Sequence, residues 1–336
     1  MLNWYFQSGN NSDVITYTKV SISRNIKGIK FPNKLNDKEK ENVINLIKEK
    51  KDTFGYGLRL LKLEEVDDIT IGTLLEKDLI TEEFVKGRLN GKALLLNDEQ
   101  NISIMINEEN HLTISVFESG EAIKDLMELV YNIESKIEKE LSFAFSEKYG
   151  YLTASPMDVG TGLKIKISAH IPGLVHTGND KELLRMLNKF NIGVDDTYSK
   201  KNDIYKIYNN ITLGISEREI AENLEEISKK IIENEKRARA YLGKDRLELE
   251  NNVLRSYGIL KYARKLKFEE VMTFLSDIKM GVDLGIVDEL DDLKINKLLV
   301  YTKPYEMQKY FNQEMDKETE NIKRAEIVKL IIDNKI

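Results

Sequence analysis

Apolar and polar residues alternate along residues 13–23, DVITYTKVSIS, with the period of two that is typical of a half-buried strand. Similar patterns predict further short strands at 55–66, 92–97, 102–107, 112–117, 162–174 and 203–214. Two of these strands flank the residues EEN. We therefore expect a β-hairpin whose turn carries Glu108 and Glu109.

Apolar residues three or four positions apart predict helices elsewhere in the chain. One such pattern covers residues 121–145, and another covers 35–52 with Asn36 or Asp37 as its cap. Ser216 followed by Glu219 is the signature of a capping box at the start of a further long helix.

Beyond residue 216 the strand patterns fade and helical patterns continue to the end of the chain. This change predicts two domains. We expect an α+β domain in residues 1–220, built on a largely antiparallel sheet flanked by helices. An all-α domain should follow in residues 221–336.

The composition is that of an ordinary globular protein, with 336 residues and a net charge of -6. The negative charge argues against broad attraction to nucleic acid or anionic lipid. There are no cysteines, and the three histidines lie far apart, so we expect no disulfide, no thiol nucleophile and no metal site. The N-terminus lacks the pattern of a signal peptide, and no stretch is long and apolar enough for a membrane span. We expect a cytoplasmic protein without membrane or direct nucleic-acid partners.

Two adjacent glutamates are an unusual choice for a structural turn, because like charges repel. Glu108 and Glu109 suit a place where a cationic group is held, although a solvated turn is the simpler interpretation of the pair alone. His111 alone is more typical of a packed strand residue than of a catalyst. The GTG at 160–162 alone indicates only a tight turn.

Several motifs together carry a family resemblance. NEENH (107–111) is similar to the NEEDH motif of the ATP:guanido phosphotransferases, and GYLTASPMDVGTGLKIKISAHIPGLV (150–175) resembles another signature of that family. SDVITYTKVSISRNIKGIKFP (12–32) matches a third in outline. The helical tail, including LENNVLRSYGILKYARKL (249–266), resembles the bacterial protein arginine kinase branch.

The resemblance implies transfer of the γ-phosphoryl group of Mg-ATP to the guanidinium of a protein arginine. A guanidinium is protonated and a poor nucleophile, so carboxylates must orient it and take its proton. The resemblance gives this catalytic role to Glu108 and Glu109, and it places Ser155, Asp158 and His111 on the substrate side. It also implies a homodimer, protein partners engaged through arginine, an activator protein, a stress-gene repressor and Clp protease components.

The chain departs from the family at most of the positions that the resemblance assigns to the nucleotide, although Arg24 is kept. These positions are Thr18, Lys19, Ser21, Arg24, Asp78, Thr113, Lys164 and Asp195. Among them, five arginines of the family's phosphate clamp become two lysines, two neutral residues and one aspartate, and a histidine becomes Asp78. Lysine keeps the charge but loses the bidentate contact, so we expect weakened binding of phosphate.

A second motif is also altered. The resemblance places a phosphoarginine pocket, RDxxRA in the family, at ENIKRA (320–325). Arg324 and Ala325 are kept, whereas Glu320 and Asn321 replace an arginine and an aspartate. Half of that pocket therefore remains, and Arg324 alone is also typical of a surface helix residue.

Three functions remain open from the sequence. The first is a pseudokinase of the guanido-kinase fold that recognises arginine or phosphoarginine in protein quality control. The second is an active protein arginine kinase with an atypical nucleotide site, which would use Mg-ATP. The third is a non-catalytic adaptor whose partners do not use Glu108 and Glu109.

Overall fold

The computed structural model describes residues 3–196 and 202–336. Its centre is an antiparallel eight-stranded sheet in the order β2-β3-β4-β5-β1-β8-β10-β9. Those strands are β1 (Ile15–Arg24), β2 (Arg59–Lys62), β3 (Ala93–Leu96), β4 (Ile102–Ile106), β5 (Leu112–Ser119), β8 (Leu163–His170), β9 (Ile192–Asp196) and β10 (Ile204–Asn209). A separate hairpin joins β6 (Phe145–Ser146) to β7 (Gly150–Tyr151).

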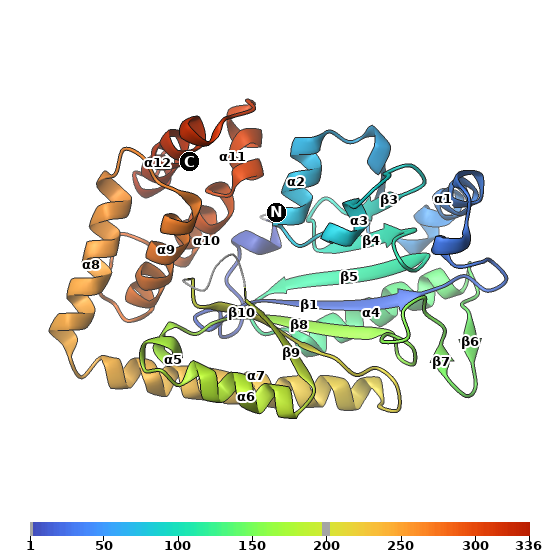
Figure 1. Ribbon diagram of the computed structural model, residues 1–336, viewed down its shortest axis with the longest axis horizontal. Coiled ribbons are helices and arrows are strands. Elements are labelled where there is room, and N and C mark those ends of the chain that lie inside the picture. Colours follow the sequence, from blue (N-terminus) through green and yellow to red (C-terminus); the bar gives the residue numbers. More distant parts are fainter. Residues whose placement is uncertain (1–2, 197–201) are drawn as a thin grey trace.

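Helices cover the sheet and form the C-terminal third of the chain (Figure 1). The helices of the sheet-containing part are α1 (Asp37–Phe54), α2 (Asp68–Glu76), α3 (Glu82–Val85), α4 (Ile123–Glu138), α5 (Pro172–His176), α6 (Asp180–Lys189) and α7 (Glu217–Leu242). Those of the C-terminal part are α8 (Arg246–Tyr262), α9 (Phe268–Asp283), α10 (Asp292–Tyr301), α11 (Pro304–Phe311) and α12 (Lys317–Ile332). The α+β class and the helical C-terminal region predicted from the sequence are confirmed.

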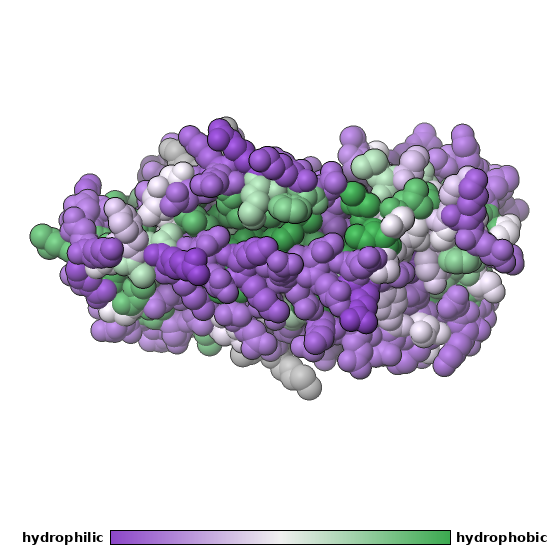
Figure 2. All heavy atoms as spheres, turned by 90° about the horizontal axis from the view of Figure 1, so that it is seen from below, coloured by the Kyte–Doolittle hydropathy of each residue, from purple (hydrophilic) through white to green (hydrophobic). Residues whose placement is uncertain are grey.

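The two faces of the sheet differ because successive residues of a strand point to opposite sides. One face is aliphatic, fully buried, and covered by α4 and α7. Its residues include Val20, Ile22, Ile104, Ile114, Val116, Ile165, Ile167 and Ile207. The outer side of this layer, formed by α5, α6 and α7, is mainly hydrophilic, with apolar side chains gathered in a band along its middle (Figure 2).

The opposite face is divided into an apolar part and a polar part. Helices α2 and α3 pack over β3, β4 and β5 through a smaller core that contains Phe84, Leu94 and Phe117. Strands β1, β8 and β10 lie beyond this cover and present serines and lysines instead. The polar part of this face holds the candidate site.

The long helix α7 begins at the predicted capping box, in which Ser216 and Glu219 each bond the backbone of the other. Its buried residues, among them Leu224 and Ile231, join the core of the sheet, while α8 to α12 form a core of their own. The boundary that we predicted between residues 220 and 221 falls within α7 and remains a prediction.

Within the described residues, no helix has the length and apolar character needed to cross a bilayer. The same residues contain no group of three histidine, aspartate or glutamate side chains placed to hold a metal ion.

Candidate functional site

Three lysines from neighbouring strands surround one carboxylate on the polar face of the sheet. Lys19 of β1 lies opposite Lys166 of β8, and Lys206 of β10 lies one strand further on. Their Nζ atoms lie 3.8, 3.8 and 3.6 Å from the carboxylate of Asp78. Tyr17 donates its hydroxyl hydrogen bond to the same carboxylate at 3.1 Å. We call Asp78 with these three lysines the Lys–Asp cluster.

The end of α2 places Asp78 in this position. The Asp78 N–H donates to the Leu75 carbonyl at 2.9 Å and the Leu79 N–H to the Leu74 carbonyl at 3.0 Å, which is the Schellman pattern. Asp78 has a φ of 59° at the position where such a motif usually has glycine. Lys19 Nζ also donates to the Asp78 carbonyl at 2.7 Å, and Ser103 of β4 holds the Leu79 carbonyl at 2.6 Å. The turn is therefore fixed to the sheet on both sides of Asp78.

The electrostatics of the cluster follow from its burial. Burial alone would raise the pKa of Asp78, but the three lysines outweigh burial and hold that pKa well below its ordinary value. Burial lowers the pKa of Lys19 to about 8, because the attraction of Asp78 is partly offset by Lys166 and Lys206. Burial also lowers the pKa of Lys166. At neutral pH, one carboxylate thus serves three ammonium groups, and the cluster keeps a net positive charge.

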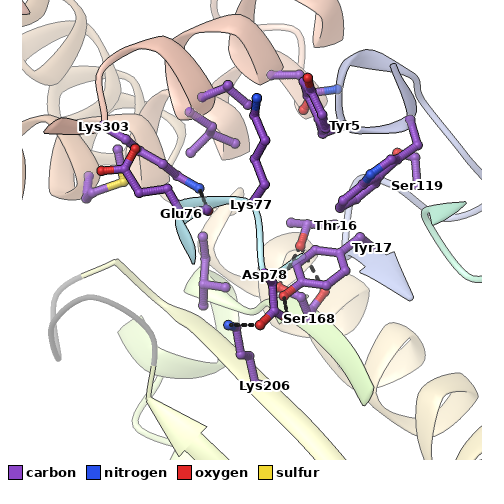
Figure 3. A pocket seen from close by; sticks show the side chains of 16 residues that line it. Tyr5, Thr16, Tyr17, Glu76, Lys77, Asp78, Ser119, Ser168, Lys206 and Lys303 are labelled. Carbon is purple, nitrogen blue, oxygen red and sulfur yellow. Dashed lines mark hydrogen bonds and ion pairs between the residues drawn. The ribbon is translucent and has the colours of Figure 1, made fainter. Parts of the chain in front are cut away.

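A cavity of about 110 Å³ lies beside the cluster, between the sheet and the helical domain. Figure 3 shows Tyr17, Asp78 and Lys206 on one side of it and Tyr5, Glu76 and Lys303 on the others. Sites for drug-sized ligands are usually roughly 300–1,000 Å³. The cavity is therefore large enough for a few waters or a small ion, and too small for a nucleotide.

The two residues before Asp78 connect the cluster to the helical domain. The Glu76 carboxylate accepts hydrogen bonds from the N–H groups of Tyr305 and Glu306 at 2.9 and 3.0 Å and so caps the first turn of α11. Lys77 forms a buried ion pair with Glu306 at 2.6 Å. Burial raises the pKa of Glu76 to about 7, although the two backbone hydrogen bonds oppose this shift. One short segment thus contacts both domains.

The hairpin turn after β4 holds the predicted pair of carboxylates. Glu108 is half-buried and accepts hydrogen bonds from the hydroxyls of Thr81 and Thr113. Glu109 is exposed, and no hydrogen bond or ion pair joins its carboxylate to the described part of the chain. Partial burial raises the pKa of Glu109, and the charges of Glu108 and Asp158 raise it further. The charge of Lys164 opposes this shift, but no ion pair joins Glu108 or Glu109 to the described residues, so a guanidinium could supply the paired cation.

A buried amide network holds the turn in place. Asn25, directly after β1, donates to Asn110 Oδ1 at 2.7 Å and accepts from the His111 N–H at 2.9 Å. Asn110 Oδ1 also accepts the Ala154 N–H at 2.8 Å, which ties in the loop that carries Ser155 and Asp158. Sequence reasoning missed Asn25 and Asn110. Asn110 lies within the NEENH motif, directly after the two carboxylates, so the sequence could have indicated that its polar side chain belongs to the site.

His111 is buried in the same region and acts as a packed residue. Its Nδ1 accepts the Ile26 N–H at 3.1 Å, and burial lowers its pKa to about 4. The ring is therefore neutral at physiological pH, and its place on the substrate side remains a prediction.

The other residues predicted to face a nucleotide divide between the two faces of the sheet. Ser21, Lys164 and Thr113 share the face of Lys19, and exposed Asp195 of β9 lies opposite Lys206. Thr18 and Arg24 lie on the other face, because each is an odd number of residues from Lys19. The structure does not bring these two residues to the Lys–Asp cluster.

Arg24 has a structural environment of its own. It is fully buried, pairs with Glu134 of α4, donates to the Thr161 carbonyl at 2.9 Å and stacks on Tyr151 at 3.5 Å. A side chain at Gly162 would place its Cβ 2.8 Å from the Arg24 guanidinium, so the GTG turn needs glycine there.

Arg324 of the predicted phosphoarginine pocket is 1% exposed. Its guanidinium donates to the carbonyls of Thr302 and Leu266 at 2.8 and 3.0 Å and to Asn321 Oδ1 at 3.0 Å, and Glu320 lies 3.6 Å away. Ala325 is buried beside it. These contacts join α12 to the segments before α9 and α11. Arg324 therefore links these helices, and its role as a ligand for phosphoarginine remains a prediction.

Comparison with known proteins adds two family matches. Residues 38–238 match the ATP:guanido phosphotransferase, C-terminal catalytic domain, and residues 246–335 match the Protein-arginine kinase McsB C-terminal domain. The gap between these matches falls at the end of α7, where the structure also changes from one core to the next.

Curated relatives match over nearly the whole chain. A protein-arginine kinase of Halothermothrix orenii is 34% identical over 333 residues, which cover 97% of this chain and 95% of the relative. One from Clostridium acetobutylicum is 35% identical over 333 residues, covering 97% and 98%.

Among solved structures, the fold is similar to that of lombricine kinase, with a TM-score of 0.58 and 19% identity over 69% of each chain. The duplicated taurocyamine kinase of Schistosoma mansoni with bound transition state analog components gives a TM-score of 0.59 at 20% identity. That match covers 68% of this chain and 34% of the other.

Proposed function

Because the chain belongs to the ATP:guanido phosphotransferases, in the protein-arginine kinase branch, we propose that it binds protein arginine side chains while its phosphotransfer activity is strongly impaired. One observation carries the second half of this proposal. The Asp78 carboxylate lies among Lys19, Lys166 and Lys206, and the family resemblance assigns the positions of Asp78 and Lys19 to the nucleotide.

The carboxylate side supports binding of arginine. Glu108 is held in place by two threonines, and Glu109 has a raised pKa with Asp158 and Glu108 as its main charged neighbours. A guanidinium between these groups would relieve the repulsion among them and would gain charge-assisted hydrogen bonds, each worth about 1.5–3 kcal/mol. Arginine suits this place better than lysine, because its planar fork can reach two carboxylates at once.

The residues on the other side do not fit a Mg-nucleotide. A phosphate chain would have to displace Asp78 from its lysines or lie against its negative charge. Of the family's arginine positions in the phosphate clamp, Lys19 and Lys164 alone keep a positive charge. We therefore assign no chemical step to a nucleotide in this chain.

A second function, active phosphotransfer with an atypical clamp, is favoured by one observation. Lys166 and Lys206 add two positive charges to the site, and neither lysine belongs to a family motif named above. If Asp78 moved away with α2, four lysines including Lys19 and Lys164 would line the polar face. This alternative predicts measurable affinity for Mg-ATP.

Direct binding tests the proposal. We expect an arginine-containing unfolded peptide to bind the wild-type protein in fluorescence anisotropy, and its lysine-substituted counterpart to bind at least tenfold more weakly. Mg-ATP, titrated in a calorimeter, should give no heat of binding at concentrations near 1 mM. Equal binding of the two peptides, or saturable binding of Mg-ATP, would contradict the respective half of the proposal.

The cellular setting follows from the same family. We propose a role in cytoplasmic protein quality control, with arginine-bearing proteins as partners, as a homodimer. An activator protein, a stress-gene repressor and Clp protease components are the candidate partners to test by co-purification with the wild type and a Glu109→Gln variant.

A further inference from the structure

Exposed apolar side chains gather near the end of the sheet that carries the β6–β7 hairpin. Phe145 and Tyr149 of this hairpin are 60% and 47% exposed, and Leu213, in the segment before α7, is 51% exposed. Together they line one hollow of about 370 Å³, with Tyr151 against the Phe145 ring at 5.3 Å. Large apolar residues that are exposed together mark an interaction surface more often than isolated ones do.

This hollow is connected to the carboxylate turn by a single loop. At one end of the loop, the Ala154 N–H is bound by Asn110, directly after Glu109. At the other end, the Thr212 hydroxyl lies 2.9 Å from the carbonyls of both Met157 and Val159. The loop is thus fixed between the two places and carries Asp158, whose charge acts on Glu109. The carboxylate turn and the apolar hollow are therefore linked through the two ends of this one loop.

We propose that the hollow binds an apolar or aromatic side chain that neighbours the bound arginine in an extended, unfolded polypeptide. This inference rests on the proposed binding of arginine and adds to it a preference for flanking sequence. The charge of Glu108, Glu109 and Asp158 selects the cationic residue, and the hollow selects its neighbour. A folded protein buries most of its large apolar residues, so an extended segment that offers both groups comes from an unfolded chain.

Matched peptides and matched variants test the inference. One labelled peptide carries an arginine with phenylalanine two to four residues away in an alanine and serine background, and a second has alanine in place of phenylalanine. A third has lysine in place of arginine. Each is titrated by anisotropy into the wild type and into Phe145→Ser, Leu213→Ser and the control Leu247→Ser, which alters a distant residue of α8 that is 80% exposed. Circular dichroism melts check that every variant is folded.

We expect phenylalanine to tighten binding to the wild type about tenfold, as one apolar group in a pocket can do. Phe145→Ser and Leu213→Ser should remove this gain and leave the affinity of the alanine peptide unchanged, while Leu247→Ser keeps the gain. Equal affinity of the phenylalanine and alanine peptides for the wild type would overturn the inference, even where arginine is still preferred to lysine.

Loss of the preference for arginine over lysine would instead refute the proposed function itself. A third result would also overturn the inference: Phe145→Ser dissociates a dimer in sedimentation velocity and leaves peptide binding unchanged. The hollow would then be a contact between two copies of the chain.

Discussion

Replacement of Asp78 by asparagine tests the Lys–Asp cluster most sharply. Asparagine has nearly the same shape, tolerates the left-handed conformation of residue 78, and can still accept the Tyr17 hydrogen bond. The substitution therefore removes one charge and little else. It leaves Lys19, Lys166 and Lys206 without their shared counterion.

The magnitude can be worked from the geometry. Breaking a buried ion pair by removing one partner typically costs about 3–5 kcal/mol. The Asp78 side chain is 19% exposed and its ion pairs are 3.6–3.8 Å long, which favours the lower end of that range. The loss in the free energy of unfolding also has an upper limit, because an unpaired lysine can release its proton. That release costs about 1.36 kcal/mol for each pH unit below the ordinary pKa of the lysine. We expect Asp78→Asn to lower the free energy of unfolding by about 3 kcal/mol at pH 7.

The pH dependence follows from the directions of the pKa shifts. The pKa of Asp78 is lowered in the folded state, so the stability that it contributes is present above its ordinary pKa of 3.8 and is lost as the pH falls through the lowered value. The pKa of Lys19 is about 8 in the folded state, so above pH 8 this lysine is neutral and needs Asp78 less. The difference between wild type and variant should therefore be largest between about pH 5 and 8 and should shrink towards pH 10.

Urea unfolding at pH 5, 7 and 9.5 measures this difference, with Asp195→Asn as the control. Asp195 is an exposed carboxylate on the neighbouring strand, and its removal should cost under about 1 kcal/mol. Asp78→Asn should also bind pyrophosphate at least tenfold more tightly than the wild type, because its three ammonium groups lack a counterion. Unchanged stability together with unchanged affinity for pyrophosphate would refute the role given to Asp78.

Three further predictions concern other parts of the molecule. Glu109→Gln should weaken binding of an arginine peptide about tenfold. Wild-type affinity should also fall as the pH is lowered, with a midpoint above 4.5, because the pKa of Glu109 is raised. Fluorescence anisotropy from pH 4 to 8 checks both effects, and an affinity that does not change with pH contradicts them. Glu76 has a folded pKa of about 7, so its stabilising effect is present below pH 4.5 and is lost as the pH rises through 7. Relative to Glu76→Gln, the free energy of unfolding of the wild type in urea should fall by about 2 kcal/mol between pH 5 and 8. A difference between the two proteins that stays constant with pH would disprove the shift. Arg324→Met should lower the free energy of unfolding by about 3 kcal/mol, because it leaves the carbonyls of Thr302 and Leu266 without their donor. Unchanged stability together with lost affinity for phosphoarginine would instead show that Arg324 is a ligand.

Local patterns in the sequence predicted much of the fold. The period of two over residues 13–23 became β1, and the hairpin with EEN at its turn became β4 and β5. The capping signals at Asn36 and Ser216 are both formed in full. Each of these depends on residues within a few positions of one another, which is why a single sequence contains them.

The Lys–Asp cluster could not be predicted in this way. Lys19, Lys166 and Lys206 meet because of the register between strands that are far apart in the chain. Asp78 joins them because the end of α2 adopts a left-handed turn, for which aspartate gives only a weak signal. The opposite placement of Arg24, by contrast, was available from the sequence, because an odd spacing from Lys19 along a strand reverses the face.

The most direct test of the central claim, that arginine is held and not phosphorylated, is a search for phosphoarginine. The purified protein is incubated with Mg-ATP and an arginine-rich unfolded protein, and the products are analysed by mass spectrometry under non-acidic conditions, with Glu109→Ala alongside. We predict no phosphoarginine above the level of the variant, although the unfolded protein binds the wild type. Phosphoarginine that forms with the wild type and disappears in Glu109→Ala would contradict the claim and would show that the lysines of the polar face serve a working nucleotide site.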